Sequence, residues 1–260
     1  TIREHVADIT INDIFLASCG GAVRRYLESK GELPEETLSA LMPISTRSKH
    51  GGSDGGNQVG MVPVPLRTDI ADPIERVRGA KRGARTSKGA SSVLGHDFAG
   101  KLIQVIPAMA AEGLINQGMV PMCNTTVSNV RGPNVPLYLA GAKLQVFLPV
   151  SIAFNGIGLN MTGFSYNGVL WVCFISCRKM LPDPKFFREC LNASFAEILT
   201  AAKKLPLVEG ASAASGSKAK PAAKPGTRKP AAAKAKAAAK AKPEAKAKPT
   251  TRRRATAAGA

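Results

Sequence analysis

The sequence lacks several features that would assign it to a common functional class. Its apolar runs are all shorter than the roughly 18 residues needed to cross a bilayer. Its five cysteines form no CxxC pair, and its three histidines are widely scattered, which argues against a disulfide framework and a metal site. It has no P-loop and no GxGxxG fingerprint. We therefore expect a reduced, cytoplasmic protein with no metal and no bound cofactor.

Acidic residues are missing from one long internal stretch. Between Gly113 and Pro182 there is no Asp or Glu at all. The stretch is mostly apolar, and its few basic residues are Arg131, Lys143, Arg178 and Lys179. One interpretation is a buried multi-strand sheet. The other is a surface that lines a channel for a hydrophobic chain or an anionic cofactor.

The last fifty residues differ from the rest of the chain. Residues 211–260 hold 14 of the 36 Lys and Arg residues but only one of the 18 acidic residues, Glu244. No large apolar residue follows Val208, and five prolines interrupt every long helix that the alanines favour. Such a segment buries too little apolar surface to offset its ordering entropy, so we predict a disordered tail over 209–260 and a folded domain over 1–208.

Hydrophobic periodicity and turn residues predict a mixed α/β (α+β) domain before the tail. Apolar residues at helical spacing predict helices over three long segments, and a short helix fits a fourth. Runs with strand character predict a sheet, with Asn167-Gly168 forming a tight turn between its last two strands. The predicted helices are 9–29, ended by Gly31, then 35–41, 72–113 and 183–204; the predicted strands are 42–46, 59–66, 123–130, 144–151, 157–165 and 168–177.

Several sequence motifs together resemble one protein family. They are NDIFLASCGGAVRRYL from Asn12, SNVRGP over residues 128–133, the PLYLAGAK stretch around Gly141, and GLNMTGFSYNG over 158–168. In this order they resemble the bacterial wax ester synthase/diacylglycerol acyltransferase family. Arg131 departs from the pattern, since the family usually has proline there. The chain opens at Thr1 within a helix-like pattern, so we expect a fragment or a processed chain.

The resemblance implies a fold and an activity. The fold would be one lobe, the C-terminal one, of a two-lobed acyltransferase of the chloramphenicol acetyltransferase/condensation type, with a mixed sheet flanked by helices. The activity would be O-acyl transfer from a fatty acyl-CoA, a substrate rather than a cofactor, to diacylglycerol or a long-chain alcohol. The general base would be a histidine of an HHxxxDG motif in an N-terminal lobe, the expected partner of this chain.

The same resemblance indicates residues that bind substrate or support the site. These are Asn12, Asp13, Ser128, Asn129, Gly132, Pro133, Gly141 and Asn160. Six of them also have a purely structural interpretation: Asn12 and Asp13 as helix-start residues, Ser128 and Asn129 as turn chemistry, Gly141 as a turn glycine, and Asn160 as a satisfied polar residue of a strand.

One segment of this chain matches the catalytic motif literally. His50 and Asp54 fit HxxxDG, but four glycines lie within the six residues 51–56. So many glycines give little rigid support to a base, which must be held within hydrogen-bond reach of its proton. We therefore expect the catalytic base to lie elsewhere.

The basic tail allows a second hypothesis about function. Its charge would attract nucleic acid by counterion release, or the anionic surface of a membrane or lipid inclusion. The tail contains no aromatic residue, so stacking on bases is not available to it. The alternative function is thus a non-catalytic binding protein docked by its tail. Either way the protein would be cytoplasmic or peripheral at the inner membrane or lipid inclusions.

Overall fold

The computed structural model describes residues 1–45, 59–94, 123–153 and 156–208. Among these residues, no helix is both long and apolar enough to cross a membrane. The tail predicted over 209–260 lies outside the described residues, as do His50 and Asp54.

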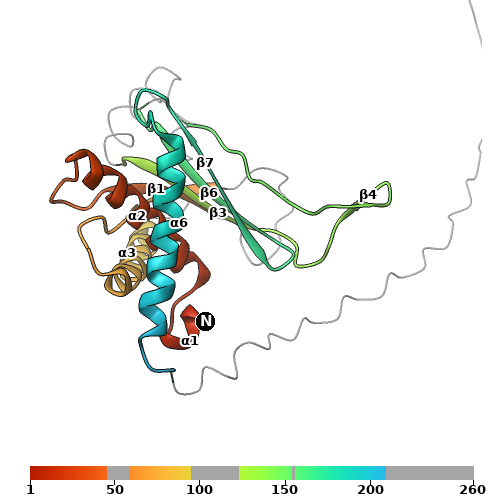
Figure 1. Ribbon diagram of the computed structural model, residues 1–260, viewed down its shortest axis with the longest axis horizontal. Helices are drawn as coiled ribbons and strands as arrows, with labels where there is room; N and C mark the ends of the chain where they lie inside the picture. Colours follow the sequence, from red (N-terminus) through yellow and green to blue (C-terminus); the bar gives the residue numbers. More distant parts are fainter. Residues whose placement is uncertain (46–58, 95–122, 154–155, 209–260) are drawn as a thin grey trace, which may run out of the picture. The chain divides into compact units, whose positions relative to one another are not determined.

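A five-stranded mixed sheet forms the centre of the fold (Figure 1). Its strand order is β2-β1-β3-β6-β7. The two central pairs, β1 with β3 and β3 with β6, are parallel, whereas the outer pairs, β1 with β2 and β6 with β7, are antiparallel. The strands are β1 (Ser39–Ser45), β2 (Val59–Pro65), β3 (Thr125–Arg131), β6 (Leu159–Tyr166) and β7 (Val169–Ser176).

Helices pack against one face of this sheet, which we call the helix face. They are α1 (Ile2–His5), α2 (Ile11–Lys30), α3 (Pro73–Leu94) and α6 (Pro184–Lys203). Alternate strand residues point into one core with the apolar residues of the helices, because side chains of a strand alternate between its two faces. The strand residues of this core include Ala40, Met42, Val62, Val64, Val127 and Met161. The mixed sheet flanked by helices is therefore confirmed.

Helix α2 begins and ends with strong local signals. Thr10 is its N-cap and forms a capping box with Asp13: the Asp13 N–H donates to Thr10 Oγ1 at 3.2 Å, and the Thr10 N–H donates to Asp13 Oδ2 at 2.8 Å. Gly31 ends the helix in the left-handed conformation with φ of 69°. The predicted helix over 9–29 and its glycine cap are thus confirmed.

Two adjacent glycines let α2 approach its neighbours closely. A Cβ added at Gly20 would lie 2.0 Å from the backbone oxygen of Leu66. A Cβ at Gly21 would lie 2.1 Å from Ser194 Oγ and 2.8 Å from Arg76 Nη1. Only glycine fits at either position without movement of the neighbouring segments.

An ionic cluster around the buried Arg76 joins the three long helices. Glu197 of α6 pairs with Arg76 of α3 and with Arg25 of α2. The Arg76 side chain is only 1% exposed, and burial lowers the pKa of its guanidinium while Glu197 opposes that shift. The cluster therefore compensates a charge that α3 places inside the helical layer.

The short helix predicted over 35–41 is wrong, because this segment runs into strand β1. Ala40 and Met42 face the core and Leu41 faces the opposite side, so the residues alternate as in a strand. Pro43 is tolerated in β1 because pairing with β3 involves only Ala40 and Leu41, and Pro43 pairs with β2 alone.

The other predicted elements agree more closely with the structure. Strands 42–46, 59–66, 123–130, 157–165 and 168–177 correspond to β1, β2, β3, β6 and β7, and the helix over 183–204 corresponds to α6. Asn167 and Gly168 form the predicted tight turn, with φ of 47° and 83°. The helix predicted over 72–113 is described only as far as Leu94, where α3 ends.

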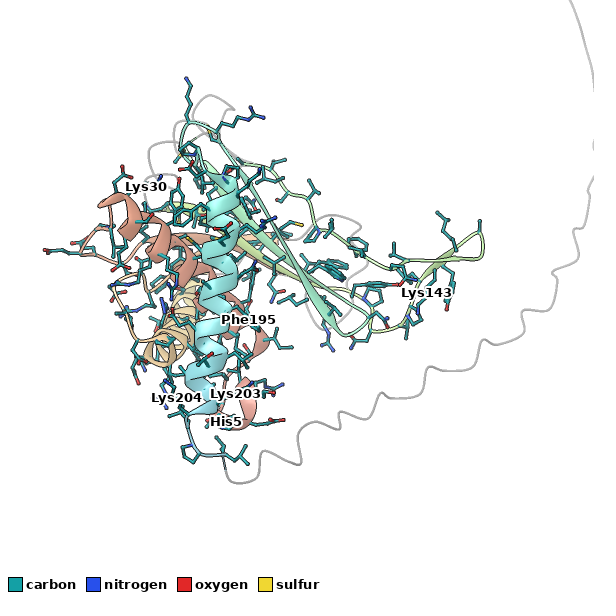
Figure 2. All side chains as sticks on the ribbon, in the orientation of Figure 1. His5, Lys30, Lys143, Phe195, Lys203 and Lys204 are labelled. Atoms are coloured by element: carbon teal, nitrogen blue, oxygen red, sulfur yellow. The ribbon has the colours of Figure 1, made fainter. Side chains whose placement is uncertain are left out.

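The strand predicted over 144–151 is wrong, because the structure has no strand there. A small hairpin of β4 (Tyr138–Leu139) and β5 (Ala142–Lys143) precedes the segment, which itself pairs with no described strand. The hairpin extends away from the five-stranded sheet, with Lys143 on it (Figures 1 and 2).

Candidate functional site

The sheet face opposite the helices carries the polar side chains that the sequence motifs indicate. We call it the open face. The register pairs Thr126 of β3 with Asn160 of β6, and Ser128 with Thr162. Because Val127 and Met161 point into the helical core, their neighbours in each strand point to the open face. Four polar side chains thus form a group at the centre of the open face.

Residues 144–152, which we call the crossing segment, run over β6 on this face. Tyr166 Oη donates to the Leu144 carbonyl at 2.9 Å, near one end of the segment. Phe147 stacks on Phe164, with ring centroids 4.1 Å apart. Asn160 holds the other end, so the segment runs antiparallel to β6 while lying above it. The six-residue offset from Tyr166 to Asn160 spans about 20 Å, and the crossing segment runs along this length.

Asn160 is the best-satisfied polar residue of this group. It is 2% exposed. Its Nδ2 donates to the Ile152 carbonyl at 2.8 Å and to Ser151 Oγ at 3.1 Å, while its Oδ1 accepts from Thr162 Oγ1 at 2.8 Å. In this chain Asn160 therefore holds the crossing segment on the sheet.

Ser128 and Asn129, adjacent in the SNVRGP motif, point to opposite faces. Ser128 is half-buried on the open face beside Thr162. Asn129 lies on the helix face, where its Nδ2 donates to Asn12 Oδ1 at 3.3 Å. The structure thus joins the Asn-Asp motif of α2 to the SNVRGP motif of β3, although 117 residues separate the two asparagines.

Asp13 lies beside Asn12 but has a different role. It is 6% exposed, and its carboxylate accepts from both the N–H and the hydroxyl of Thr10. These contacts make Asp13 the second half of the α2 capping box. Its predicted helix-start role is therefore present in the structure.

Gly132 and Pro133 fix the loop that leaves β3. The Gly132 N–H donates to Ser165 Oγ at 3.2 Å, and a Cβ at Gly132 would lie 2.3 Å from the Ser165 carbonyl oxygen. The Pro133 carbonyl accepts from the Asn167 N–H at 2.9 Å. The two contacts bind the motif to the end of β6 and to the turn that follows it, and a side chain at position 132 has no room.

Gly141 lies in the turn of the β4–β5 hairpin. Its φ is 83° and that of Ala140 is 48°, so the turn needs a residue that tolerates the left-handed region. Gly141 is exposed, and a Cβ there would meet no atom within 4 Å in the described part of the chain. Within this chain it lies apart from the open-face group.

Of the three histidines, only His5 lies within the described residues. Its Nδ1 is 2.7 Å from the Leu205 carbonyl oxygen, beside Lys203 and Lys204 at the end of α6 (Figure 2). The described ranges contain no group of three or more His, Cys, Asp or Glu residues that could hold a metal ion. Burial raises the pKa of the Cys19 and Cys173 thiols, which disfavours their nucleophilic thiolate forms. The described side chains thus supply no evident base for catalysis.

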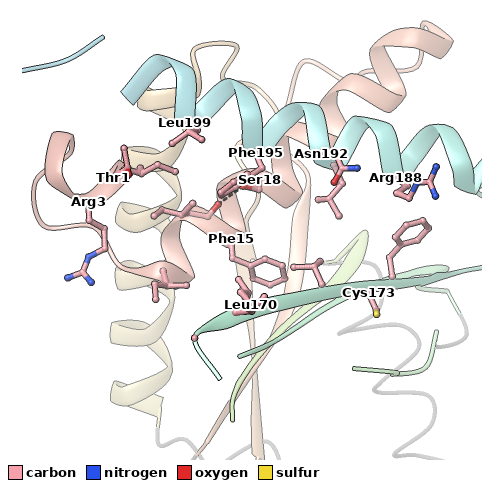
Figure 3. A pocket seen from close by; sticks show the side chains of 18 residues that line it. Thr1, Arg3, Phe15, Ser18, Leu170, Cys173, Arg188, Asn192, Phe195 and Leu199 are labelled. Atoms are coloured by element: carbon pink, nitrogen blue, oxygen red, sulfur yellow. Dashed lines mark hydrogen bonds between the residues drawn. The ribbon is translucent and has the colours of Figure 1, made fainter. Parts of the chain in front are cut away.

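An apolar cavity of about 1070 Å³ lies on the helix face, between β7 and α6 (Figure 3). Apolar residues of α2, β7 and α6 line most of it, and Arg3 and Arg188 also contribute. It is separated from the open-face group by the sheet itself. The apolar lining residues include Ile11, Ile14, Phe15, Leu170, Val172, Phe174, Leu191, Phe195 and Leu199.

Sequence reasoning missed two residues of the open face. Tyr166 is 1% exposed, and its hydroxyl also accepts from the Leu137 N–H at 2.9 Å, so it holds both sides of the β4–β5 hairpin. Thr126 is 3% exposed, and its hydroxyl has no hydrogen-bond partner among the described residues. No local pattern marks either residue, since both depend on contacts between distant segments.

Comparison with known proteins now identifies the family. The model of the WS/DGAT C-terminal domain matches residues 55–199. The chain belongs to this wax ester synthase/diacylglycerol acyltransferase family. It is 38% identical over 178 residues to the O-acyltransferase WSD of Acinetobacter baylyi, a match that covers 67% of this chain and 38% of that protein.

Two further members of the family support the assignment. A candidate diacylglycerol O-acyltransferase of Mycobacterium tuberculosis is 36% identical over 203 residues, which cover 76% of this chain and 44% of that protein. The solved wax ester synthase/diacylglycerol acyltransferase of Marinobacter aquaeolei is 30% identical with a TM-score of 0.61, over 78% of this chain and 46% of that structure. The chain therefore spans less than half the length of the family members that it matches.

Proposed function

We propose that this chain is the C-terminal half of an O-acyltransferase that moves a fatty acyl group from acyl-CoA to diacylglycerol or a long-chain alcohol. The observation that carries the proposal is the match of residues 55–199 to the C-terminal domain of this family. The names of the relatives, O-acyltransferase and wax ester synthase/diacylglycerol acyltransferase, agree with it.

The reaction exchanges a thioester for an oxygen ester. The acceptor hydroxyl loses its proton to a general base as its oxygen attacks the thioester carbonyl. An oxyanion forms, hydrogen-bond donors stabilise it, and the C–S bond then breaks. The proton passes to the departing sulfur, so the products are an ester and free CoA.

The general base belongs to the other half of the enzyme. His5 is engaged at the end of α6, and none of the open-face side chains discussed above is basic. The resemblance to the family assigns the base to an HHxxxDG motif in the N-terminal half. The two halves would then enclose the substrates between them, with the open face forming one wall.

The open face suits this role in polarity and charge. Ser128 is half-buried there and points to the same side as Asn160 and Thr162, so its hydroxyl can donate to a substrate carbonyl. No acidic residue occurs between Gly113 and Pro182, the stretch that supplies β3, β6 and β7. The phosphates of CoA would therefore meet no carboxylate from these strands.

The test uses a fusion in which the N-terminal half of the Acinetobacter baylyi O-acyltransferase precedes Thr1. We expect the fusion to form ester from palmitoyl-CoA and either hexadecanol or diacylglycerol. Ser128→Ala should lower that activity by about 10–100-fold, the effect of one lost hydrogen bond to the reacting group. Ser29→Ala is the control, because Ser29 is exposed on α2. Equal activity of both variants would refute the role of Ser128, and no ester with either acceptor would count against the proposed function.

The basic tail supports a proposal about location. We infer a cytoplasmic protein that associates with an anionic membrane or lipid-inclusion surface through residues 211–260. This places the enzyme where its apolar substrates accumulate. No observation favours the nucleic-acid alternative. Sedimentation with anionic vesicles should fall when residues 211–260 are removed, and unchanged sedimentation would contradict the inference.

A further inference from the structure

The excess positive charge of the folded domain lies in one helix. Residues 76–94 of α3 contain six Lys and Arg residues and no acidic residue. Residues 1–210 contain 22 Lys and Arg residues against 17 acidic residues, so the rest of this range is close to neutral. The stretch 76–94 is therefore where the domain would attract an anionic partner.

Five of these six basic side chains share the outward side of α3. Arg78, Arg82 and Arg85 are exposed and follow one another at spacings of four and three residues, so they lie on one helix face. Lys88 is exposed and continues that face over a length of about 15 Å, and Lys81 beside it is half-buried. We call these five residues the basic stripe. The apolar side of α3, which packs in the domain core, consists of Ile74, Val77, Ala80 and Ala84.

Acidic side chains compensate only one end of the basic stripe. Glu75 pairs with Arg78 at 2.7 Å, whereas the other four stripe residues form no ion pair with a described residue. Like charges three and four residues apart on a helix repel one another, so the stripe is unfavourable for the helix that carries it. An anionic surface would remove this repulsion, which favours such a surface as the partner of the stripe.

A hollow between α3 and the segment after β2 lies beside Arg82. Its volume is about 350 Å³, and its polar lining comes from Arg67, Arg82, Thr86 and Ser87. Asp69 already pairs with Arg67 at 3.0 Å, and the Thr86 hydroxyl donates to the Arg82 carbonyl at 3.1 Å. The guanidinium of Arg82 can hold a phosphate group through two parallel N–H bonds, and the Ser87 hydroxyl can donate to the same group. The hollow thus suits the phosphate of a lipid headgroup.

We propose that the basic stripe is the surface by which the folded domain lies on an anionic phospholipid surface, with a headgroup phosphate against Arg82. The inference rests on the proposed function, because the apolar substrates of that reaction collect at lipid surfaces. It adds a contact on the folded domain to the one inferred for residues 211–260. Phospholipid is favoured over nucleic acid because α3 has no aromatic residue that could stack on bases.

Lysine labelling tests which side of the domain meets the lipid. The full chain is treated with an amine-reactive reagent, and the modified lysines are mapped by mass spectrometry with and without phosphatidylglycerol vesicles. Lys88 lies in the stripe and Lys179 in the loop before α6, and both are exposed. Labelling of Lys88 should fall severalfold when the vesicles are added, whereas labelling of Lys179 should stay unchanged. Binding through residues 211–260 alone would not distinguish these two lysines.

A pair of double variants separates the stripe from positive charge in general. Arg82→Gln with Arg85→Gln removes two charges from the stripe, and Arg178→Gln with Lys179→Gln removes two exposed charges elsewhere. The first pair should weaken vesicle binding about 25-fold, or about fivefold for each charge next to the lipid. The second pair should weaken it by about twofold or less, because charges beyond a Debye length from the surface are screened. Neither pair should lower the thermal unfolding temperature, since all four side chains contact water.

The outcomes distinguish this inference from the proposed function. Equal labelling of Lys88 and Lys179 on anionic vesicles would overturn the lipid surface, and ester formation by the fusion would still support the enzyme assignment. Protection of Lys88 on vesicles, with a fusion that forms no ester, would support the surface and count against the enzyme. Protection of Lys88 by CoA or by duplex DNA, but not by vesicles, would assign the stripe to another anion and overturn the proposal.

Discussion

Replacing glycine by alanine should have opposite effects at different helical positions. At Gly89 of α3, a Cβ would meet no atom within 4 Å in the described part of the chain, so Gly89→Ala should stabilise the chain by up to about 1 kcal/mol through helix propensity. At Gly21 of α2 the same propensity gain applies. There, however, the new Cβ would lie 2.1 Å from Ser194 Oγ and 2.8 Å from Arg76 Nη1.

The size of the destabilisation at the two α2 glycines depends on which neighbouring groups must move. Overpacking a core costs about 1–3 kcal/mol, which exceeds the propensity gain of about 1 kcal/mol. Gly21→Ala should therefore destabilise the chain by up to about 2 kcal/mol, since side chains of α3 and α6 must shift. Gly20→Ala should cost about 2 kcal/mol or more, because its Cβ would lie 2.0 Å from the backbone oxygen of Leu66, which cannot rotate away.

Urea unfolding followed by circular dichroism measures all three variants against the parent chain. We expect the unfolding midpoint to rise for Gly89→Ala and to fall for the other two, with the slope unchanged. A rise for Gly20→Ala or Gly21→Ala would refute the close helix packing on which this reasoning depends.

Three further predictions concern caps, charges and thiols. Thr10→Ala removes the N-cap of α2 and should lower the free energy of unfolding by about 1 kcal/mol in the same urea assay; no change would contradict the capping box. Glu197→Ala leaves the buried Arg76 charge without its partner and should lower the free energy of unfolding by about 3 kcal/mol. An effect below about 1 kcal/mol would show that the pair is solvated. Cys177 is exposed and should react rapidly with a thiol reagent. Cys19 should react only on unfolding, because it is fully buried and burial raises its pKa. Mass mapping that finds early modification of Cys19 would contradict its burial.

Local chemistry predicted much of the fold. The Asn167-Gly168 turn and the Gly31 cap depend on residues adjacent in sequence, and both appear as predicted. Asp13 was indicated as a helix-start residue, and the structure shows it in a capping box with Thr10, three positions away. These features need no knowledge of distant segments.

The errors arose where tertiary pairing decides the outcome. Residues 35–41 contain good helix formers, but contacts with β2 and β3 make the end of that segment a strand. Residues 144–151 have the alternation of a strand but form none. No described strand pairs with them, so alternation in the sequence was not sufficient to make a strand.

The candidate site was only partly predictable for the same reason. The motifs indicated Ser128 and Asn160, and the register of β3 and β6 brings them to one face. It does not bring Asn12, Asp13 or Gly141 to that face: Asn12 supports Asn129 from the helix side, and Gly141 lies in the hairpin turn. A role for these three residues at a site formed with the N-terminal half stays a prediction.

The central claim is that this chain is half of an ester-forming enzyme and lacks the proton-accepting residue. The most direct measurement compares ester formation from radiolabelled palmitoyl-CoA and hexadecanol by the chain alone and by its fusion to the N-terminal half. We predict no ester above background from the chain alone and steady turnover by the fusion. Turnover by the chain alone that disappears on His50→Ala would contradict the account, because it would place the base within residues 1–260.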